Sequence, residues 1–406
     1  MGNRQRQLAK RKKKGKRQGK QDTQLVSAYN LILAGRYDEA EPIVKRVLSK
    51  NPDNITAIDY LGTILVMRED YQSAIDLFKS KPENKMLKRK LFTIYIHTGQ
   101  LMKAWTHPDL EEPIPSLQAI PWKGEPINDK CIFIYSFYDL GEDIQYTSCI
   151  PDLQAKKIIF ATNKRLVPIF NRSFPGIEAV DADKIIIHKN NVVQKEKKQL
   201  FTIDIQTDTL QLPRYFRQDM DSFPDRSQHL YADPELIRKW EKRFDNLPGL
   251  KVGISWKGGK EINNKIRRSI PLEDWTPILS TPGISWINLQ YGDCQSDIKN
   301  MPIHDWPDVD PLKDLETQAA QMAAMDLVIT IDTTAAHLAG ALGVKTWVML
   351  PTLPAPAWFQ EREDSPWYPS ARLFRQEKHG DWRPVIERVA IELQKLLEIN
   401  DRQCYG

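Results

Sequence analysis

One segment of the chain, residues 326–343, constrains the fold class more than any other. It begins at Leu327 to Ile331 with a run that is apolar at nearly every position, as in a buried strand. A sharp turn follows, then a small apolar helix that stops at Gly343, and then a second apolar strand from Lys345 to Leu350. A strand, a helix and a strand in this order build parallel sheets. The segment therefore predicts an α/β domain that binds its ligand at the carboxyl ends of these strands.

The turn inside this segment has the composition of a phosphate-binding site. Asp332 can cap the helix, and Thr333 and Thr334 can add hydroxyl donors. The backbone N–H groups of Thr334, Ala335 and the next residue, together with the positive end of the helix dipole, can bind an anion. His337 lies one turn further, on the same side as the two threonines. The alternative is an ordinary capped helix with a partly buried histidine, and the residues leave both interpretations open.

A basic loop follows another predicted strand, residues 251–256. It begins with Lys257 and Gly258, and five cationic side chains fall within the twelve residues that end at Arg268. Glycine brings the backbone close to a ligand, and lysine and arginine suit a diphosphate. A loop that is basic only for solvation is the competing interpretation. Its place after a parallel strand favours ligand binding.

Acidic residues follow the first predicted strand of the preceding α/β region, residues 131–135. Gly141 can form a tight turn, and Glu142 or Asp143 would then point a carboxylate into the cleft as a general base. Acids are also ordinary first-turn residues that the helix dipole stabilises, so the residues leave both roles open. We interpret three Asp-x-Asp triplets as surface acids and not as a metal site: Asp181 to Asp183, Asp219 to Asp221 and Asp308 to Asp310.

The chain divides by composition into five parts. Residues 1–20 form a basic arm that we expect to be disordered, because it holds ten Lys or Arg and no acid. Residues 22–105 predict about three tetratricopeptide repeats, the last degenerate, since Tyr37 and Tyr71 recur 34 residues apart. Residues 106–129 are a proline-rich linker. Two α/β domains are then expected, at 130–245 and 246–400, with a bridging helix from Pro234 to Phe244 and a closing helix from Trp382 to Glu398.

Charge and hydropathy indicate the cellular location to expect for this chain. The net charge is +5, and removing the ten charges of the arm leaves −5 for the rest. The arm suits an anionic membrane face or nucleic acid, or it is a solubilising tail without a specific target. No apolar run of membrane-spanning length and no signal peptide are recognised. Four scattered cysteines suggest neither disulfides nor a metal site. We therefore expect a cytoplasmic protein, or one peripheral on the inner face of the membrane.

Several motifs, taken in order, resemble those of a known family. The chain resembles bacterial glycosyltransferases of the GT-B fold that carry N-terminal tetratricopeptide repeats. These are related to the lipopolysaccharide heptosyltransferases of glycosyltransferase family nine, and more distantly to O-GlcNAc transferase. The matching segments lie within about residues 120–395: Pro121 to Glu125, Leu140 to Gln145, Leu250 to Gly258, Arg268 to Pro271, Asp326 to Gly343 and Asp364 to Pro369.

The resemblance implies a nucleotide-sugar donor held mainly by the C-terminal domain. It implies that Thr333, Thr334 and His337 meet the donor diphosphate and that Arg268 steadies the leaving group, where heptosyltransferases often place a lysine. It also implies that no metal or other cofactor is needed. The family pattern Gly-Leu-Gly-Asp reads Asp-Leu-Gly-Glu here and ends at Glu142, so the base is this residue or the aspartate that follows it.

We therefore expect a metal-independent glycosyltransferase acting on a protein or a cell-surface glycan acceptor, with a possible protein partner on the repeats. The alternative is a non-catalytic tetratricopeptide-repeat adaptor, in which the repeats bind a partner and a degenerate GT-B body is a retained scaffold or binds a partner or a nucleotide sugar. The changes at Asp139 and Glu142 motivate that alternative.

Overall fold

The computed structural model describes residues 23–106, 113–136, 138–195, 198–258 and 267–405, with side chains described up to residue 399. The predicted basic arm lies outside these residues, as do part of the proline-rich linker and the middle of the basic loop. The chain forms two compact units. One comprises Met1–Ile94 with Glu377–Gly380, and the other comprises Tyr95–Gln376 with Asp381–Gly406.

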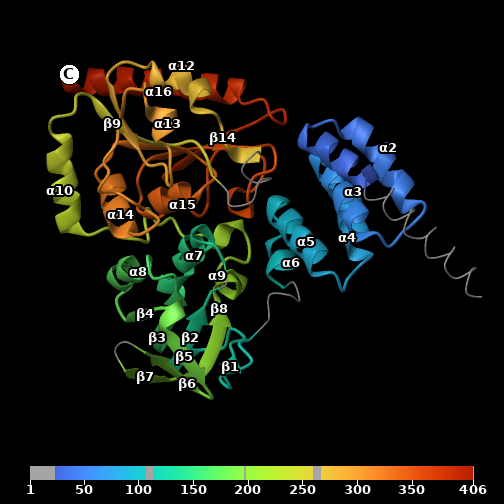
Figure 1. The fold of residues 1–406 in the computed structure, drawn as a ribbon. Coiled ribbons are helices and arrows are strands. Elements are labelled where there is room, and N and C mark those ends of the chain that lie inside the picture. The colour runs from blue at the N-terminus through green and yellow to red at the C-terminus, as the bar shows by residue number, and fades with distance from the viewer. Residues whose placement is uncertain (1–22, 107–112, 137, 196–197, 259–266, 406) are drawn as a thin grey trace, which may run out of the picture. The chain divides into compact units, whose positions relative to one another are not determined.

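The first unit is helical (Figure 1). The helices that begin at Ile55 and Tyr71 follow residues whose side chains accept hydrogen bonds from N–H groups of the first turn. Asn54 accepts from Ala57 N at 2.9 Å, and Asp70 accepts from Ser73 N at 3.2 Å. The predicted helical N-terminal region is thus confirmed, and its assignment to tetratricopeptide repeats stays a prediction. The helices are residues 23–33, α2 (Tyr37–Leu48), α3 (Ile55–Met67), α4 (Tyr71–Lys79) and α5 (Lys85–His97), which continues into the second unit.

The second unit contains two Rossmann-like domains in succession. In the first, among the residues described, the main sheet has the order β1-β8-β2-β3-β4 and every pair is parallel. Its strands are β1 (Ile120–Pro121), β2 (Ile127–Tyr135), β3 (Ala155–Thr162), β4 (Ile177–Asp181) and β8 (Ile205–Asp208). Its helices are α7 (Leu140–Tyr146), α8 (Val167–Ser173) and α9 (Leu212–Phe216), and α6 (Leu101–Trp105) precedes the domain.

A small antiparallel sheet corrects one strand assignment. The segment from Lys184 to Ile187, with three successive isoleucines, predicts a third buried strand. Instead, β5 (Ile185–His188) pairs antiparallel with β6 (Asn191–Gln194), and β6 pairs with β7 (Gln199–Thr202). Residues of β5 are alternately half-buried and exposed, so only one face of this strand is covered. The next parallel strand of the main sheet is β4, whose mixed sequence gave no apolar run.

The second domain has a larger parallel sheet. Within the described residues its order is β11-β10-β9-β12-β13-β14. In order along the chain this is 3-2-1-4-5-6, the order of a dinucleotide-binding Rossmann sheet. The strands are β9 (Leu250–Ser255), β10 (Ile284–Asn288), β11 (Ile303–His304), β12 (Leu327–Ile331), β13 (Thr346–Leu350) and β14 (Ala371–Arg375). The helices are α10 (Pro234–Phe244), α12 (Thr276–Leu279), α13 (Gln295–Ile298), α14 (Leu315–Ala323), α15 (Thr334–Ala341) and α16 (Arg383–Tyr405).

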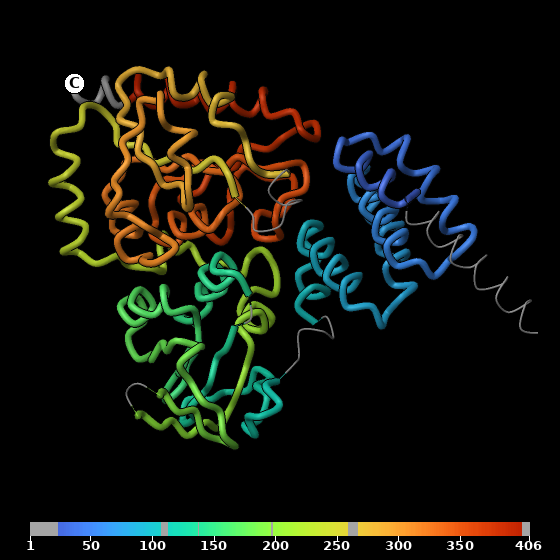
Figure 2. The backbone as a smooth tube through the Cα atoms, in the orientation of Figure 1, coloured from blue at the N-terminus to red at the C-terminus, as the bar shows by residue number. Residues whose placement is uncertain are grey.

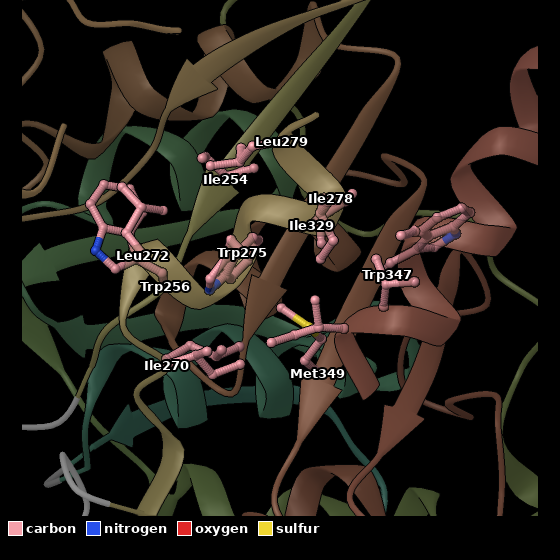
Figure 3. Close-up of a cluster of buried hydrophobic side chains, with 14 of the residues drawn as sticks. Ile254, Trp256, Ile270, Leu272, Trp275, Ile278, Leu279, Ile329, Trp347 and Met349 are labelled. Carbon is pink, nitrogen blue, oxygen red and sulfur yellow. The ribbon is translucent and has the colours of Figure 1, made fainter. Parts of the chain in front are cut away.

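Large aromatic side chains fill the core of this second domain. Trp256, Trp275 and Trp286 are fully buried, and Ile329 and Met349 of the central strands belong to the same cluster (Figure 3). Burial of each such side chain contributes on the order of 1.5–3 kcal/mol to folding. This core fixes the ends of β9 and β12, from which the segments that carry the candidate ligand-binding residues leave.

The predicted α/β class, two Rossmann-like domains after a helical region, is confirmed. The tube in Figure 2 shows the two domains as successive green and orange bodies joined by the yellow helix α10. That helix has the bounds predicted for the bridge. The domain limits predicted at 130–245 and 246–400 remain predictions.

Candidate active site

A cavity of about 470 Å³ lies between the two Rossmann-like domains. The loops that line it follow parallel strands of both sheets, which is where open α/β sheets bind ligands. Its lining comprises residues 136, 138–143, 162, 163, 165 and 181–183 of the first domain, and residues 268, 289, 291, 311, 312, 315, 318, 332–335, 337 and 355 of the second.

The position of this cavity follows from the topology of the second sheet. β9 lies next to β10 on one side and β12 on the other, and the chain connections diverge between β9 and β12. The loop carrying Arg268 leaves β9, and the turn of Asp332 and Thr333 leaves β12. The topological switch point therefore brings together two segments that are more than sixty residues apart in the sequence.

Asp332 does not cap the helix, and that prediction is wrong. Its side chain, 1% exposed, accepts hydrogen bonds from Trp358 Nε1 at 2.8 Å and from Ala355 N at 2.9 Å. The N-cap of α15 is Thr333, whose hydroxyl makes no capping hydrogen bond. A buried carboxylate is retained where it is fully hydrogen-bonded, and the indole and amide donors come from a segment that the local sequence does not reveal.

Arg268 lines the cavity and joins it to Asp332. Its NH1 donates to the backbone carbonyl of Asp332 at 2.9 Å and lies 3.8 Å from the carboxylate. The side chain is one-fifth exposed, so the guanidinium is held by the wall while part of it faces the cavity. The structure thus brings together Arg268 and the turn at the start of α15, as the sequence predicts.

Fewer backbone N–H groups of that turn are available to an anion than the sequence predicts. The N–H of Ala336 donates to the Thr333 carbonyl at 3.0 Å and so belongs to the helix. Thr333, Thr334 and Ala335 line the cavity, which leaves the N–H groups of Thr334 and Ala335 as the candidate donors.

The two basic-loop residues predicted to bind the donor do not line the cavity. Lys257 Nζ forms an ion pair with Asp297 at 2.7 Å. Gly258 packs against Thr333, because a Cβ at Gly258 would lie 2.4 Å from Thr333 Cγ2. The absence of a side chain at Gly258 therefore lets the backbone pack closely against Thr333. The Lys257 side chain is held by Asp297, away from the cavity lining.

His337 forms the floor of the cavity between the two domains. Its ring is 6% exposed, and Nδ1 lies 2.9 Å from the hydroxyl of Tyr368. The ring of Trp358 packs 5.1 Å from it, centre to centre. Burial lowers the pKa of His337 to about 4, so the imidazole is neutral at neutral pH. Tyr368 and Trp358 are site-supporting residues that sequence reasoning did not assign, although Tyr368 lies in the Asp364 to Pro369 motif.

The opposite wall is acidic. Glu142 is exposed and accepts from the backbone N–H of Asp139 at 3.1 Å. Asp143 is 3% exposed and accepts from Thr162 Oγ1 at 2.8 Å and from Ser136 Oγ. Both carboxylates line the cavity, but only Glu142 is open to it.

Burial raises the pKa of Asp143 to about 7, although the hydroxyls of Ser136 and Thr162 lower it. Asp208, at the end of β8, also has its pKa raised to about 7 by burial. A perturbed carboxyl beside a cleft is typical of functional sites. Sequence reasoning missed Asp208, Ser136 and Thr162, and the one available signal was that each lies at or just after the end of a parallel strand.

Asp183 is exposed and Asp181 is half-buried, in keeping with their interpretation as surface acids, but the sequence did not predict that they lie at a cavity. Both line the cavity, and Asp181 is the last residue of β4. The omission follows from the missed strand. Among the described residues, no group of three or more His, Cys, Asp or Glu side chains is arranged to hold a metal ion.

Hydrogen bonds between the domains close the rim of the cavity. Arg165 NH1 donates to the carbonyl of Pro311 at 2.9 Å, and Arg172 NH1 donates to Glu316 Oε1 at 3.0 Å. These contacts join the two domains.

Comparisons with known proteins place the chain only broadly. No family model matches it. It is 30% identical to protein FlbA of Caulobacter vibrioides over 356 residues, which are 82% of this chain and 59% of FlbA. The chain thus spans less than two thirds of that relative. In the described part of the chain, no helix is both long and apolar enough to cross a membrane.

Among solved structures, the chain is similar to a glycosyl transferase of family 9 from Veillonella parvula, with 13% identity and a TM-score of 0.46 over 68% of this chain and 98% of the other. It is also similar to the E. coli ADP-heptose lipopolysaccharide heptosyltransferase II, with 12% identity and a TM-score of 0.43 over 65% of this chain and 99% of the other. At these scores the likeness assigns no activity to the chain.

Proposed function

We propose that this protein is a GT-B glycosyltransferase that moves a sugar from a nucleotide-sugar donor to a hydroxyl acceptor without a metal. The observation that carries the proposal is the arrangement across one cavity. Arg268 and the start of α15 lie at the switch point of one sheet, and the carboxylates of Glu142 and Asp143 lie on the facing wall. The ordered motifs that resemble heptosyltransferases include both sides of that arrangement.

The donor diphosphate would lie against the start of α15. The N–H groups of Thr334 and Ala335 and the hydroxyl of Thr333 supply neutral donors, and Arg268 supplies a charge. These groups are held in place before reaction, since Arg268 is bonded to Asp332 and that carboxylate is bonded to Trp358. Preorganised donors aimed at a departing diphosphate stabilise the charge that develops as the glycosidic bond breaks.

Burial lowers the pKa of His337 to about 4, so the imidazole is neutral at neutral pH and can contribute a hydrogen bond but no charge. Its ring is buried beneath the turn, and Tyr368 bonds to Nδ1, which fixes the orientation of the ring. We infer that His337 shapes the base of the donor site and offers Nε2 to the donor. The ring nitrogen that carries the proton depends on the role of the Tyr368 hydroxyl.

Glu142 is the proposed general base. It is the exposed carboxylate of the pair, and it lies in the first turn of α7 beside the cavity. Asp143, with hydroxyl partners on both oxygens, is better suited to fix α7 on the ends of β2 and β3. The acceptor hydroxyl would lose its proton to Glu142 while it attacks the anomeric carbon, and the nucleoside diphosphate would leave toward Arg268.

A non-catalytic adaptor remains the second candidate, and a specific observation favours it. Asp143 is fully engaged by Ser136 and Thr162, and Glu142 also binds the backbone N–H of Asp139. A body in which both carboxylates served only the structure would bind nucleotide sugars without turnover. The N-terminal helices would then carry the function by binding a protein partner.

A donor screen followed by a transfer assay separates the two candidates. ADP-, UDP- and GDP-sugars are tested by thermal shift and calorimetry, because a ligand of the folded state raises its apparent stability. The bound donor is then incubated with peptide and glycan acceptors and, separately, with water alone. Binding with release of nucleoside diphosphate supports the enzyme, binding without release supports the adaptor, and no binding contradicts both. EDTA in parallel assays tests metal independence.

A further inference from the structure

A short helical hairpin, residues 95–105, touches both Rossmann-like domains. It consists of the end of α5, a turn and α6, and it belongs to the second compact unit. Gly99 in the turn has φ +67°, a left-handed conformation that glycine adopts without strain. The hairpin is thus a built element with a defined turn.

The second helix of the hairpin is anchored to the first Rossmann-like domain. Trp105 is buried, and its Nε1 donates to the carbonyl of Arg217 at 2.6 Å. Arg217 is itself 2% exposed, and its NH2 donates to Asp152 at 2.7 Å and to the carbonyl of Ser148 at 3.0 Å. Figure 1 shows α6 beside α9, and residues of these two helices are in contact. The anchor is therefore a buried, charge-assisted network.

The first helix of the hairpin ends against the second Rossmann-like domain. His97 is 5% exposed and faces the backbone carbonyls of Pro354 and Ala355, with Arg375 and Arg267 nearby. Its ring nitrogens make no hydrogen bond of ordinary length to the described residues, and burial lowers its pKa to about 4. His97 thus packs as a neutral ring against residues 354–355.

That segment is the outer support of the candidate site. The N–H of Ala355 donates to the carboxylate of Asp332 at 2.9 Å, and Trp358 donates to the same carboxylate. Arg375 also holds the segment by donating to the carbonyl of Trp358 at 2.6 Å. A displacement at His97 would therefore reach Asp332, and through it Arg268, by one backbone hydrogen bond.

We propose that the hairpin, residues 95–105, is a positioning strap that fixes the two Rossmann-like domains against each other and braces the Ala355 to Asp332 support of the cavity. His97 and Trp105 are its two anchors, and neither touches substrate. Since α5 begins in the helical unit and ends at His97, the strap is also the covalent route from that unit to the cavity. Its effect on donor binding rests on the proposed function, whereas its effect on the cavity support does not.

The strap predicts that the effects of losing Trp105 and His97 are coupled, whereas local packing alone predicts that they are independent. If each anchor acts alone, loss of Trp105 affects only the region of Arg217, and loss of His97 affects only residues 354–359. If the hairpin acts as one element, loss of either anchor loosens both regions, and the two losses are not additive. Non-additivity between residues that do not touch each other indicates coupling through a shared element.

Amide hydrogen exchange of the full chain distinguishes independent anchors from a hairpin that acts as one element. Exchange of residues 354–359 and 213–217 is measured in His97→Ala, Trp105→Phe, the double variant and Phe78→Leu. The last variant is the control, because it disturbs an equally buried side chain in the helical unit. His97→Gln, which keeps an N–H donor for the two carbonyls, replaces His97→Ala if the latter does not fold.

We expect Trp105→Phe to speed exchange at Ala355 on the order of tenfold, the factor that corresponds to one buried hydrogen bond. The double variant should be hardly faster than His97→Ala, and Phe78→Leu should leave both regions unchanged. The strap is excluded if Trp105→Phe leaves residues 354–359 at the wild-type rate, or if the two effects multiply.

Nucleotide binding separates this proposal from the proposed function. ADP, UDP and GDP are titrated calorimetrically into the wild type and the same variants. A strap that braces the donor site weakens binding of whichever nucleotide binds, in parallel with the exchange at Ala355. If none binds to the wild type, the proposed donor site is wrong, and the exchange data still decide whether the strap exists.

Discussion

Gly141 and His337 meet across the cavity: a Cβ on Gly141 would lie 2.7 Å from His337 Cδ2. The two residues belong to different domains and to the two helices, α7 and α15, that flank the cavity. Since α7 and α15 pack against each other, this contact sets the separation of the acidic wall from the turn proposed to bind the diphosphate. The glycine is therefore required by close approach, in addition to any demand of the turn.

Gly141→Ala should consequently force the walls apart. Overpacking of this kind costs about 1–3 kcal/mol of stability, and the larger effect is expected on function, because the base and the donor site move relative to each other. Thermal unfolding and calorimetry with the bound nucleotide measure the two effects. Gly62→Ala is the control, since it creates a clash with Phe78 in the helical unit. Equal nucleotide affinity in Gly141→Ala and wild type would contradict the role of the contact.

Arg268→Ala should abolish most of the affinity for nucleoside diphosphate. The guanidinium is a positively charged group that lines the cavity beside the start of α15, so its loss removes a charge that would face the diphosphate. Turnover should also fall, since loss of one preorganised donor slows reactions on the order of 10²–10³-fold. Arg268→Lys should restore part of the binding, since it keeps the charge but loses the fork. Arg243→Ala, which removes an exposed pair with Asp308, should change neither affinity nor turnover. Undiminished turnover in Arg268→Ala would remove this residue from the mechanism.

Glu142→Gln and Asp143→Asn should have different consequences. The exposed carboxylate of Glu142 is the proposed base, so its amide should slow transfer on the order of 10²–10⁴-fold while donor affinity stays the same. Asp143→Asn keeps the shape of a buried group that holds α7, and it should affect stability and its pH dependence more than the chemical step. Steady-state kinetics with the identified donor distinguishes the two variants. A catalytic defect confined to Asp143→Asn would transfer the base role to Asp143.

The sequence was most informative where function depends on contiguous residues. The strand, turn and helix at 326–343 follow from apolar periodicity, and the structure confirms β12, α15 and β13. It was least informative where a side chain finds a distant partner. Asp332 binds Trp358, 26 residues away, and Lys257 binds Asp297, 40 residues away. Such pairings are set by tertiary packing, so a local pattern assigned Asp332 to the helix cap and Lys257 to the ligand.

Dependence on tertiary packing also explains why the sequence did not reveal all the acidic residues near the cavity. Asp181 lines the cavity because it ends the sheet strand β4, but β4 mixes polar and apolar residues without a long apolar run and was not recognised. Asp208 ends β8, whose sequence is mostly polar although every residue is buried. A polar strand can be buried when its neighbours satisfy it, and a single sequence does not contain that information. The sequence therefore revealed the residues of the motifs, but it did not reveal the buried residues that support them in the fold.

The pH dependence of stability should identify the buried carboxyls. Burial raises the pKa of Asp143 from its ordinary value to about 7, so between pH 4 and about 7 the native state binds a proton that the unfolded chain has released. Its contribution to stability therefore falls as pH rises through that window. Asp143→Asn cannot ionise, and its stability relative to wild type should improve from pH 4 to about 7 by up to roughly 4 kcal/mol.

The comparison must be a difference between variant and wild type, because buried histidines act in the opposite sense. Burial lowers the pKa of His337 and of His229 to about 4, so their contribution to stability falls as pH decreases below about 6.5. Urea unfolding of wild type, Asp143→Asn and Asp208→Asn at several pH values between 4 and 8 isolates the carboxyls, and both variants should show the same trend. A variant-minus-wild-type difference that stays flat over this range would mean that Asp143 remains ionised in the folded protein.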